Sequence, residues 1–385
     1  MFLQIHTLTT YPASLLNRDD AGLAKRIPFG DAIRLRISSQ CLKRHWREDL
    51  TAQLPDVPDG LRTRSFFTRC VRPRAEALGV PEPALDELVE VLAKGVLRTG
   101  KGDKDGGVKA GGDLNQPVLF GVREADYFAR LIKEASTKDN PAEALEDRLK
   151  DKQERENLKA MSKSAAGLTA ALFGRMVTSD LLARVDAPVH VAHAFTVHAA
   201  HTELDYFTVV DDLNRDDETG AAHANQTELG SGLYYGYVVV DLPLLISNIT
   251  GTEGKDWKTQ DNELPKRILT ALIQSILRRS PGAKLGSTAP YAWADLLLLE
   301  VGHTQPRSLA NAFLRAVDTR GDVRRNAAQA MLEYLSRLDR MYGKEDGAQR
   351  FLSTSLDLDQ DTDGRLAPVL PVPSAVEQAL MALWS

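Results

Sequence analysis

Positively charged side chains are concentrated between Asn17 and Arg47, against the trend of the whole chain. The stretch holds eight Lys or Arg residues and three Asp residues, a net charge of +5, whereas the formal net charge of all 385 residues is −5. Concentrated positive charge beside a helix start can bind a phosphodiester backbone, because the first N–H groups of a helix also attract anions. This stretch is therefore the first candidate for a functional site.

Two predicted elements position these charges, and the first is a strand. Polar and apolar side chains alternate over residues 34–38, so that one face carries Arg34, Arg36 and Ser38. This is the period of a half-buried strand. Either Ser38 or Ser39 can cap a following helix, since a serine oxygen accepts a hydrogen bond from a first-turn N–H group.

The second element is a helix over about residues 40–48. Two apolar side chains four residues apart form one face, and Lys43 and Arg47 lie on a different side. Ser38, Gln40, Lys43 and Arg47 would then form one row along the strand end and the helix start. The alternative is that the two cations are only the solvated face of a surface helix, where such residues are common.

An apolar run, Tyr206–Val210, interrupts a polar segment from His201 to Ser231 that has no sustained periodicity. Such a run can form a small satellite core. It can also act as a wedge between stacked bases, as apolar side chains of other nucleic-acid-binding proteins do.

Paired carboxylates indicate an alternative chemistry. Asp19–Asp20, Asp211–Asp212 and Asp216–Asp217 could bind magnesium for phosphodiester cleavage, which would make the protein a metal-dependent ribonuclease. Asp19 and Asp20 more simply orient Arg18 or contact a neighbouring subunit. A third possibility is a protein-only scaffold in which the basic stretch is an intersubunit surface.

Other cofactor and metal sites are not predicted. His190, His193, His198 and His201 include two His-x-x-His spacings, but residues three apart in a strand face opposite sides and no cysteine or acid stands beside them at ligand spacing. The glycines of residues 99–113 have no strand before them and no helix after them, as a nucleotide-binding loop requires. We expect no catalytic residues, no metal and no cofactor.

Composition is that of a globular protein, with 43% hydrophobic and 26% charged residues. The mild acidic excess argues against unselective nucleic-acid binding and fits a basic groove on one face of a protein that packs its other faces against protein. Two cysteines give no disulfide framework. The first residues lack the features of a signal peptide, and no apolar run is long enough to span a membrane, so we expect a cytoplasmic protein.

The order of elements predicts an α+β fold. Strand and helix patterns at both ends of the chain surround a helical block over residues 51–164, which contains the Gly-rich, charged segment 99–113. Leu168–Met176 and Val189–His198 have strand character. Clear later elements are a strand over Gly232–Asp241, a helix over Leu264–Arg278, a strand over Ala294–Val301 and helices over Ser308–Val317, Val323–Tyr342 and Ser374–Leu383.

Short motifs in a fixed order add a family resemblance. They are Leu16–Asp20, Phe29–Gly30, Arg36–Gln40, Leu42–Arg44, Gly174–Met176 with Ser179, His193–Ala194, Phe207–Thr208 with Val210–Leu213, Pro281–Lys284 and Ala310–Phe313. In these motifs the chain resembles the CasC family, the backbone subunits of the type I-E CRISPR surveillance complex, Cascade. The resemblance covers roughly residues 2–320.

The resemblance implies a ferredoxin-like, RNA-recognition-type palm from residues 1–50 and 165–385. It also implies inserted helical fingers over 51–164 and a protruding thumb loop at about 199–231. No RNP1-type aromatic run is present, so bases are not expected to stack on the sheet face.

The resemblance also implies a non-catalytic function. Several copies would polymerise along one CRISPR RNA and hold its spacer, while base pairing recognises the target DNA. The other partners implied are the remaining Cascade subunits and a recruited helicase-nuclease. The thumb of one subunit would fold over the guide held by its neighbour and kink it.

Site residues follow from the basic stretch and the matching family positions. The expected phosphate contacts are Arg18, Lys25, Lys43 and Arg47, with Arg44 and Lys284 as further contributors. Ser38 and Gln40 would bond backbone oxygens. Phe207 and Thr208 would interrupt the base stack, and Tyr206 would offer a stacking platform. Met176 would pack against guide bases, with ordinary core filling as the alternative.

Overall fold

The computed structural model describes residues 1–98, 107–177, 179, 181–210, 221–252, 254–343, 348–358, 367 and 369–385, without the side chains of 163–165, 207–210, 221–225 and 254. The chain divides into two compact units. The first comprises Met1–Gln53, His190–Asp241 and Lys266–Ser385, and the second comprises Leu54–Val189 and Leu242–Pro265. Each unit is described by itself.

The first unit is built on an antiparallel sheet. Its strands are β1 (Phe2–Ser14), β2 (Arg26–Phe29), β3 (Ala32–Ile37), β6 (Val189–Val191), β7 (Ala194–Thr196), β8 (His201–Val210), β9 (Ala221–Asp241), β10 (Ala294–Gly302) and β11 (Gln349–Thr354). They lie in the order β11-β10-β1-β9-β7-β3-β2, and β6 and β8 also pair with β9.

The centre of this sheet has ferredoxin-like topology. Along the chain, β1 is followed by helix α1 (Ser39–Gln53), then by β7 and β9, then by helix α9 (Glu263–Arg278) and β10. In space these four strands lie in the order β10-β1-β9-β7. This is the β-α-β-β-α-β arrangement, and the predicted α+β class is confirmed.

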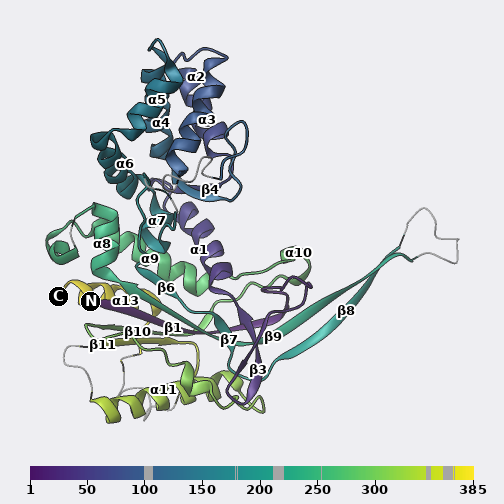
Figure 1. Cartoon of the computed structure of the whole chain (residues 1–385). Coiled ribbons are helices and arrows are strands. Elements are labelled where there is room, and N and C mark those ends of the chain that lie inside the picture. The colour runs from purple at the N-terminus through teal and green to yellow at the C-terminus, as the bar shows by residue number, and fades with distance from the viewer. Residues whose placement is uncertain are drawn as a thin grey trace. The chain divides into compact units, whose positions relative to one another are not determined.

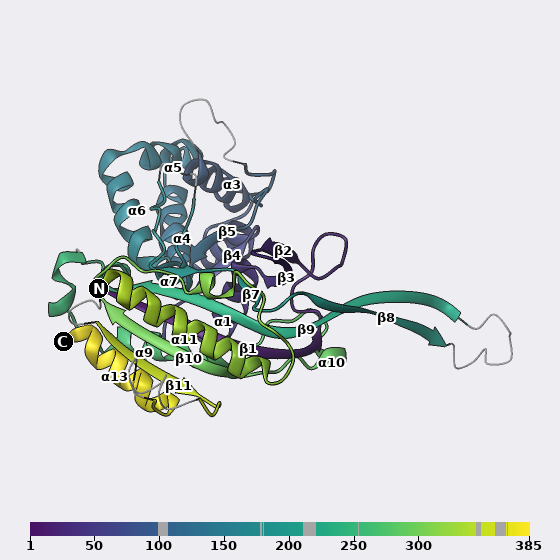
Figure 2. The ribbon, with the colours of Figure 1, turned by 90° about the horizontal axis from the view of Figure 1, so that it is seen from below.

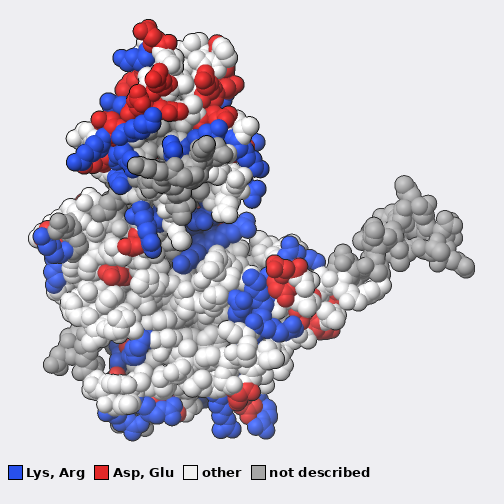
Figure 3. Space-filling view, viewed as in Figure 1, with Lys and Arg blue, Asp and Glu red and all other residues white. Residues whose placement is uncertain are grey.

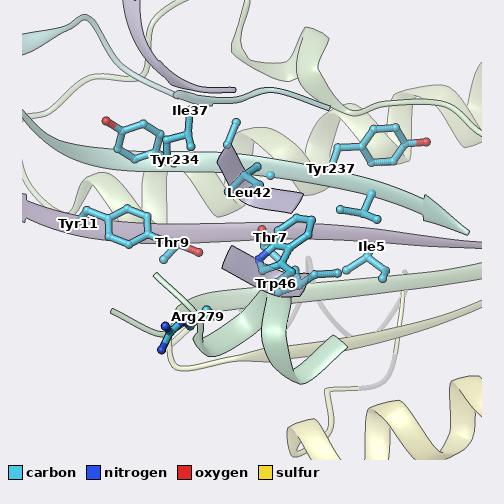
Figure 4. Close-up of a pocket in the computed structure, with 14 residues that line it drawn as sticks. Ile5, Thr7, Thr9, Tyr11, Ile37, Leu42, Trp46, Tyr234, Tyr237 and Arg279 are labelled. Atoms are coloured by element: carbon cyan, nitrogen blue, oxygen red, sulfur yellow. The ribbon is translucent and has the colours of Figure 1, made fainter. Parts of the chain in front are cut away.

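Both faces of the central strand are covered. Ile5 and Thr7 of β1 lie with Leu42 and Trp46 of α1 around a small cavity of about 30 Å³, which Figure 4 shows. On the opposite face of β1, Leu8 is buried in one cluster with residues of helix α11 (Val323–Tyr342). In Figure 1, α1 and α9 lie on one side of the sheet and α11 on the other, and Figure 2 looks onto α11.

Helix α11 covers the sheet face that an ordinary RNA-recognition motif uses to stack bases. An ordinary RNA-recognition motif offers the sheet face away from its two helices to RNA. Here aromatic side chains on that face pack into an apolar cluster, in which Tyr235 is buried with Phe313 and Met331. The absence of an RNP1-type aromatic run in the sequence therefore has a direct structural counterpart.

Shorter elements complete the first unit. They are helix α10 (Leu285–Thr288), the 3-10 turn Ala310–Phe313 and helix α13 (Val372–Trp384). Helix α13 packs against β10 and β11. The expected helix over Ser308–Val317 is reduced to the 3-10 turn.

A two-stranded hairpin extends from the sheet. Its strands, β8 and the first half of β9, pair from His201↔Ser231 onward, and the tip, residues 211–220, lies outside the described residues. Both views show the hairpin reaching beyond the other strands (Figures 1 and 2). The expectation of an irregular polar segment between His201 and Ser231 is wrong. Residues 201–206 are all exposed, so no buried face imposed the alternation by which strands are recognised.

The second unit is mainly helical. Its helices are α2 (Arg72–Ala77), α3 (Ala84–Leu97), α4 (Val122–Ser136), α5 (Pro141–Lys150), α6 (Lys152–Ala165), α7 (Leu168–Phe173) and α8 (Leu242–Thr250), with a π-helix at Phe67–Val71 and a 3-10 helix at Gly254–Thr259. Strands β4 (Gly60–Thr63) and β5 (Val118–Gly121) form a small ladder. The core contains Phe66 stacked on Phe120, with ring centroids 4.1 Å apart.

The boundaries of this unit differ from the expected ones. Residues 165–189, assigned above to the palm, belong to the helical unit, and the chain returns to it over 242–265. The strand expected over Leu168–Met176 is wrong, because α7 occupies Leu168–Phe173. Its apolar, buried positions 168, 170 and 172 have the two-residue spacing of a strand. A helix of six residues is too short for its 3.6-residue period to be distinguished from that spacing.

Among the described residues, no helix has the length and apolar character needed to cross a bilayer.

Candidate nucleic-acid interface

The strand–helix junction is tied to the preceding loop by hydrogen bonds to the side chain and backbone of Asn17 and to the backbone of Lys25. The Ser38 N–H donates to Asn17 Oδ1 at 2.9 Å. The Lys25 N–H donates to the Asn17 carbonyl at 2.9 Å, and the Lys25 carbonyl accepts from the Arg36 N–H at 2.8 Å. The loop that carries Arg18 and Lys25 therefore lies alongside the end of β3, and the structure brings these predicted residues together.

A tight turn presents Arg18 to solvent. Asp19 Oδ1 accepts from the N–H groups of Ala21 at 3.0 Å and of Leu23 at 2.9 Å. Arg18, Asp19 and Asp20 are exposed. Asp19 thus shapes the turn that follows Arg18. The other aspartate pairs, at 211–212 and 216–217, lie outside the described residues.

Ser38 is the N-cap of α1. Its Oγ accepts from the Cys41 N–H at 3.3 Å, and the side chain is buried. A serine cap satisfies only part of the first turn, so a helix start keeps donors for an anion. Gln40 is exposed beside this cap.

The predicted basic row lies on one side of α1. Lys43 and Arg47 are half-buried and share a face with Gln40 by helical spacing, while Leu42 and Trp46 are buried on the other side. Burial lowers the pKa of Lys43.

Arg44 lies outside that row. It is exposed and forms an ion pair with Glu48, with Nε and Oε1 3.1 Å apart. An exposed pair of this kind is weak, so Arg44 contributes less to the cationic surface than its neighbours do.

Arg34 is not part of the surface. The sequence places it on the polar face of β3, but the structure buries it completely. Its guanidinium donates to the carbonyls of Phe29 at 3.3 Å and Phe313 at 2.9 Å, and to Asp31 at 3.3 Å. Burial lowers the pKa of Arg34, with Asp31 opposing. Arg34 is thus a structural residue that joins the β2–β3 turn to the 3-10 turn.

His193, a residue of the His193–Ala194 motif that is not among the predicted site residues, lies beside Arg36. The Arg36 Nη1 group donates to His193 Nδ1 at 3.0 Å. Because arginine has no acceptor, this bond places the imidazole proton on Nε2. Burial lowers the pKa of His193, with Arg36 and Lys25 adding to the effect. A neutral, exposed N–H donor therefore adjoins the cations. The proximity of His193 to Arg36 follows from the pairing of β3 with β7, which the sequence does not predict.

Lys284 lies at the root of the hairpin. Its Nζ donates to Thr227 Oγ1 on β9 at 2.5 Å. The same loop is attached to the residue that follows β1, since the Ala283 N–H donates to the Leu15 carbonyl at 3.0 Å. Figure 3 shows Lys and Arg side chains gathered around the hairpin root, next to a small acidic patch.

The remaining predicted residues lie elsewhere. Tyr206 is on β8 with its side chain 60% exposed, opposite Gln226. Phe207 and Thr208 follow in β8, and their side chains lie outside the described residues. Met176 belongs to the second unit and is 85% exposed, so it does not fill a core.

A larger cavity in the first unit is electrically balanced. It has a volume of about 790 Å³ and lies beside β10, α11 and β11. Its arginines are already paired: Arg307 with Glu300 at 2.7 Å, and Arg350 with Glu300 at 2.8 Å and with Asp339 at 2.5 Å. A phosphate would have to displace these carboxylates, so the cationic surface around α1 is the better candidate. In the described part of the chain, no group of three or more His, Cys, Asp or Glu residues is placed to hold a metal ion.

Comparisons with known proteins agree with the fold. The Cas_CT1975 family, described as CT1975-like protein, matches residues 3–368. A chain from a solved "CRISPR RNA-guided surveillance complex, pre-nicking" is similar over 100% of both chains, with a TM-score of 0.76 and 28% identity. A second, from a "CRISPR RNA-guided surveillance complex", covers 99% of each chain with a TM-score of 0.61 and 23% identity, which shows the fold alone. Among curated proteins, none matches the chain. Because the family match spans nearly the whole sequence, the chain belongs to the Cas_CT1975 family of CT1975-like proteins.

Proposed function

We propose that the protein is a non-catalytic subunit that binds CRISPR RNA through the cationic surface around the start of α1. The observation that carries the proposal is the hydrogen-bonded frame that brings Arg18, Lys25 and Arg36 beside the capped helix. Similarity to a chain of a CRISPR RNA-guided surveillance complex supports RNA as the polyanion.

The geometry favours recognition of the sugar-phosphate backbone over recognition of bases. The sheet face that usually stacks bases is buried under α11. The exposed groups that remain near α1 are mostly cations and N–H donors, which contact phosphates without reading sequence. Recognition of a DNA target is then left to base pairing with the guide.

The hairpin supports a repeated assembly. A strand pair that reaches beyond its own sheet is suited to contact a neighbouring copy, and head-to-tail contacts that do not close give a helical filament. We infer that copies follow one another along the guide in a type I-E Cascade backbone. The other Cascade subunits, the target DNA and a recruited helicase-nuclease are further partners, in the cytoplasm.

Binding of purified protein to a guide-length RNA tests the proposal, with magnesium present and RNA integrity followed on a gel. We expect saturable binding that weakens with salt, filaments that form only with RNA, and intact RNA. Filaments that form equally well without RNA would support a protein-only scaffold. Cleavage that is lost in Asp19→Asn would support the ribonuclease and overturn the non-catalytic reading.

A further inference from the structure

The root of the hairpin is held from both of its faces. Thr227 and Glu228 are consecutive residues of β9, so their side chains point to opposite faces of the strand. Lys284 donates to Thr227 Oγ1 at 2.5 Å on one face. On the other face, the Ala24 N–H donates to Glu228 Oε2 at 2.7 Å, and Arg26 forms an ion pair with Glu228 Oε1. The direction of the hairpin is therefore set by two loops of the palm.

Those two loops also carry residues proposed to bind the guide. Ala24 and Arg26 flank Lys25, and the bridge between Arg18 and Ala24 closes the same loop. Arg26 also donates to Thr202 Oγ1 of β8 at 3.1 Å, so that the loop contacts both strands of the hairpin. Displacement of this loop would alter the cationic surface and the hairpin together.

Glu228 is an unexpected residue beside a surface that binds a polyanion. A carboxylate there repels phosphates, and its side chain is only 6% exposed. Both of its oxygens are occupied, one by a backbone N–H group and one by a guanidinium. The contacts account for its presence, because they hold the loop in place and neutralise the carboxylate.

We propose that Glu228 is a positioning residue that couples guide binding to the direction of the hairpin. The proposal rests on the function proposed above. Guide bound at Arg18 and Lys25 restrains the loop, the loop restrains Glu228 through Ala24 and Arg26, and the hairpin is thereby directed toward the next subunit.

Guide affinity separates positioning from simple electrostatics. The test variant is Glu228→Gln, and the matched control is Glu203→Gln on the exposed part of β8, which removes the same charge. If Glu228 only repels phosphates, both variants bind a guide-length RNA as tightly as the wild type or more tightly. If it positions the loop, Glu228→Gln binds about tenfold more weakly, the size of one charge-assisted hydrogen bond, and Glu203→Gln does not.

The direction of the hairpin is measured by the distance between two spin labels. They are attached at Asp205 on β8 and Arg337 on α11 in a Cys41→Ser, Cys70→Ser background. We expect a narrow distribution of label distances in the wild type, and a still narrower one after guide RNA is added. The distribution in Glu228→Gln should be broader than that of the wild type. Arg26→Gln, which removes the Arg26 partner of the ion pair with Glu228, should also broaden the distance distribution. Equal widths in all proteins would overturn the proposal.

The two measurements fail independently. If wild-type protein does not bind guide, the proposed function is refuted, while the label distances without RNA still test the clamp. If the wild type binds guide and Glu228→Gln matches Glu203→Gln in both affinity and label distances, only the positioning role is refuted. Circular dichroism melts of each variant establish that the comparison is made between folded proteins.

Discussion

Replacement of Arg47 by Gln should reduce the salt dependence of guide binding. Arg47 is half-buried on the polar side of α1, and among the described residues no acidic side chain lies within salt-bridge distance of it. Each phosphate contact to a single strand adds about 0.7 to the slope of log affinity against log salt. Five cations around α1 (Arg18, Lys25, Arg36, Lys43 and Arg47) would give a slope of about −3.5 per protomer.

The variant should therefore have a slope of about −2.8. Between about 50 and 200 mM salt, the affinity ratio of wild type to variant should shrink by about 2.6-fold. Fluorescence anisotropy of a labelled RNA that accommodates one protomer, measured at four salt concentrations, has the precision to resolve this change.

The control is Arg337→Gln on α11, on the opposite face of the sheet. It makes the same chemical change at another exposed arginine. We expect its slope to equal that of the wild type. Equal loss of slope in both variants would mean that net charge alone governs binding. No loss in Arg47→Gln would remove Arg47 from the interface.

Three further predictions concern stability and the hairpin. Gly30 has a φ of 64°, and a Cβ there would lie 1.7 Å from the Leu314 carbonyl oxygen. The variant Gly30→Ala should therefore lower the free energy of unfolding by about 3 kcal/mol or more in denaturant melts. The control Gly321→Ala, at a φ of 78° with open space around the added Cβ, should lower it by about 1 kcal/mol. Burial lowers the pKa of His6, with its hydrogen bond to Glu300 opposing. Below about pH 6.5 the unfolded chain takes up a proton that folded His6 does not, so the free energy of unfolding should fall as pH falls, by up to about 1.4 kcal/mol per pH unit. The variant His6→Gln should show a weaker dependence of this free energy on pH. An equal dependence in wild type and variant would contradict this reasoning. Tyr206→Ala should leave the melting temperature and guide affinity unchanged and weaken pairing of the bound guide with a complementary strand; equal pairing would argue against a stacking role.

The sequence predicts the local elements around the site because each has its own buried face. Leu42 and Trp46 fix the period of α1, and alternation around Leu35 fixes β3. Charge also marks the loop that carries Lys25. These patterns depend only on residues that are close in sequence, so the elements can be predicted without knowledge of the tertiary fold.

What the sequence does not predict depends on contacts between distant segments. Arg34 has the alternation of an exposed residue, yet its donors meet carbonyls near residue 313. His193 joins Arg36 only because β7 pairs with β3. Residues 201–206 of β8 are all exposed, so the alternation by which a strand is recognised in sequence is absent there. The family resemblance implied the protruding thumb, but not that it is a strand pair clamped at Glu228.

Helix α11 has one more consequence. Because this helix covers the face that an ordinary RNA-recognition motif offers to bases, a guide bound as proposed above would contact the protein through its sugar-phosphate backbone, which every nucleotide has in common. Under the proposed function, a guide with a new spacer would need no change in the protein that binds it, because the contacts do not depend on the identity of the bases. One protein sequence would then serve guides of any spacer sequence.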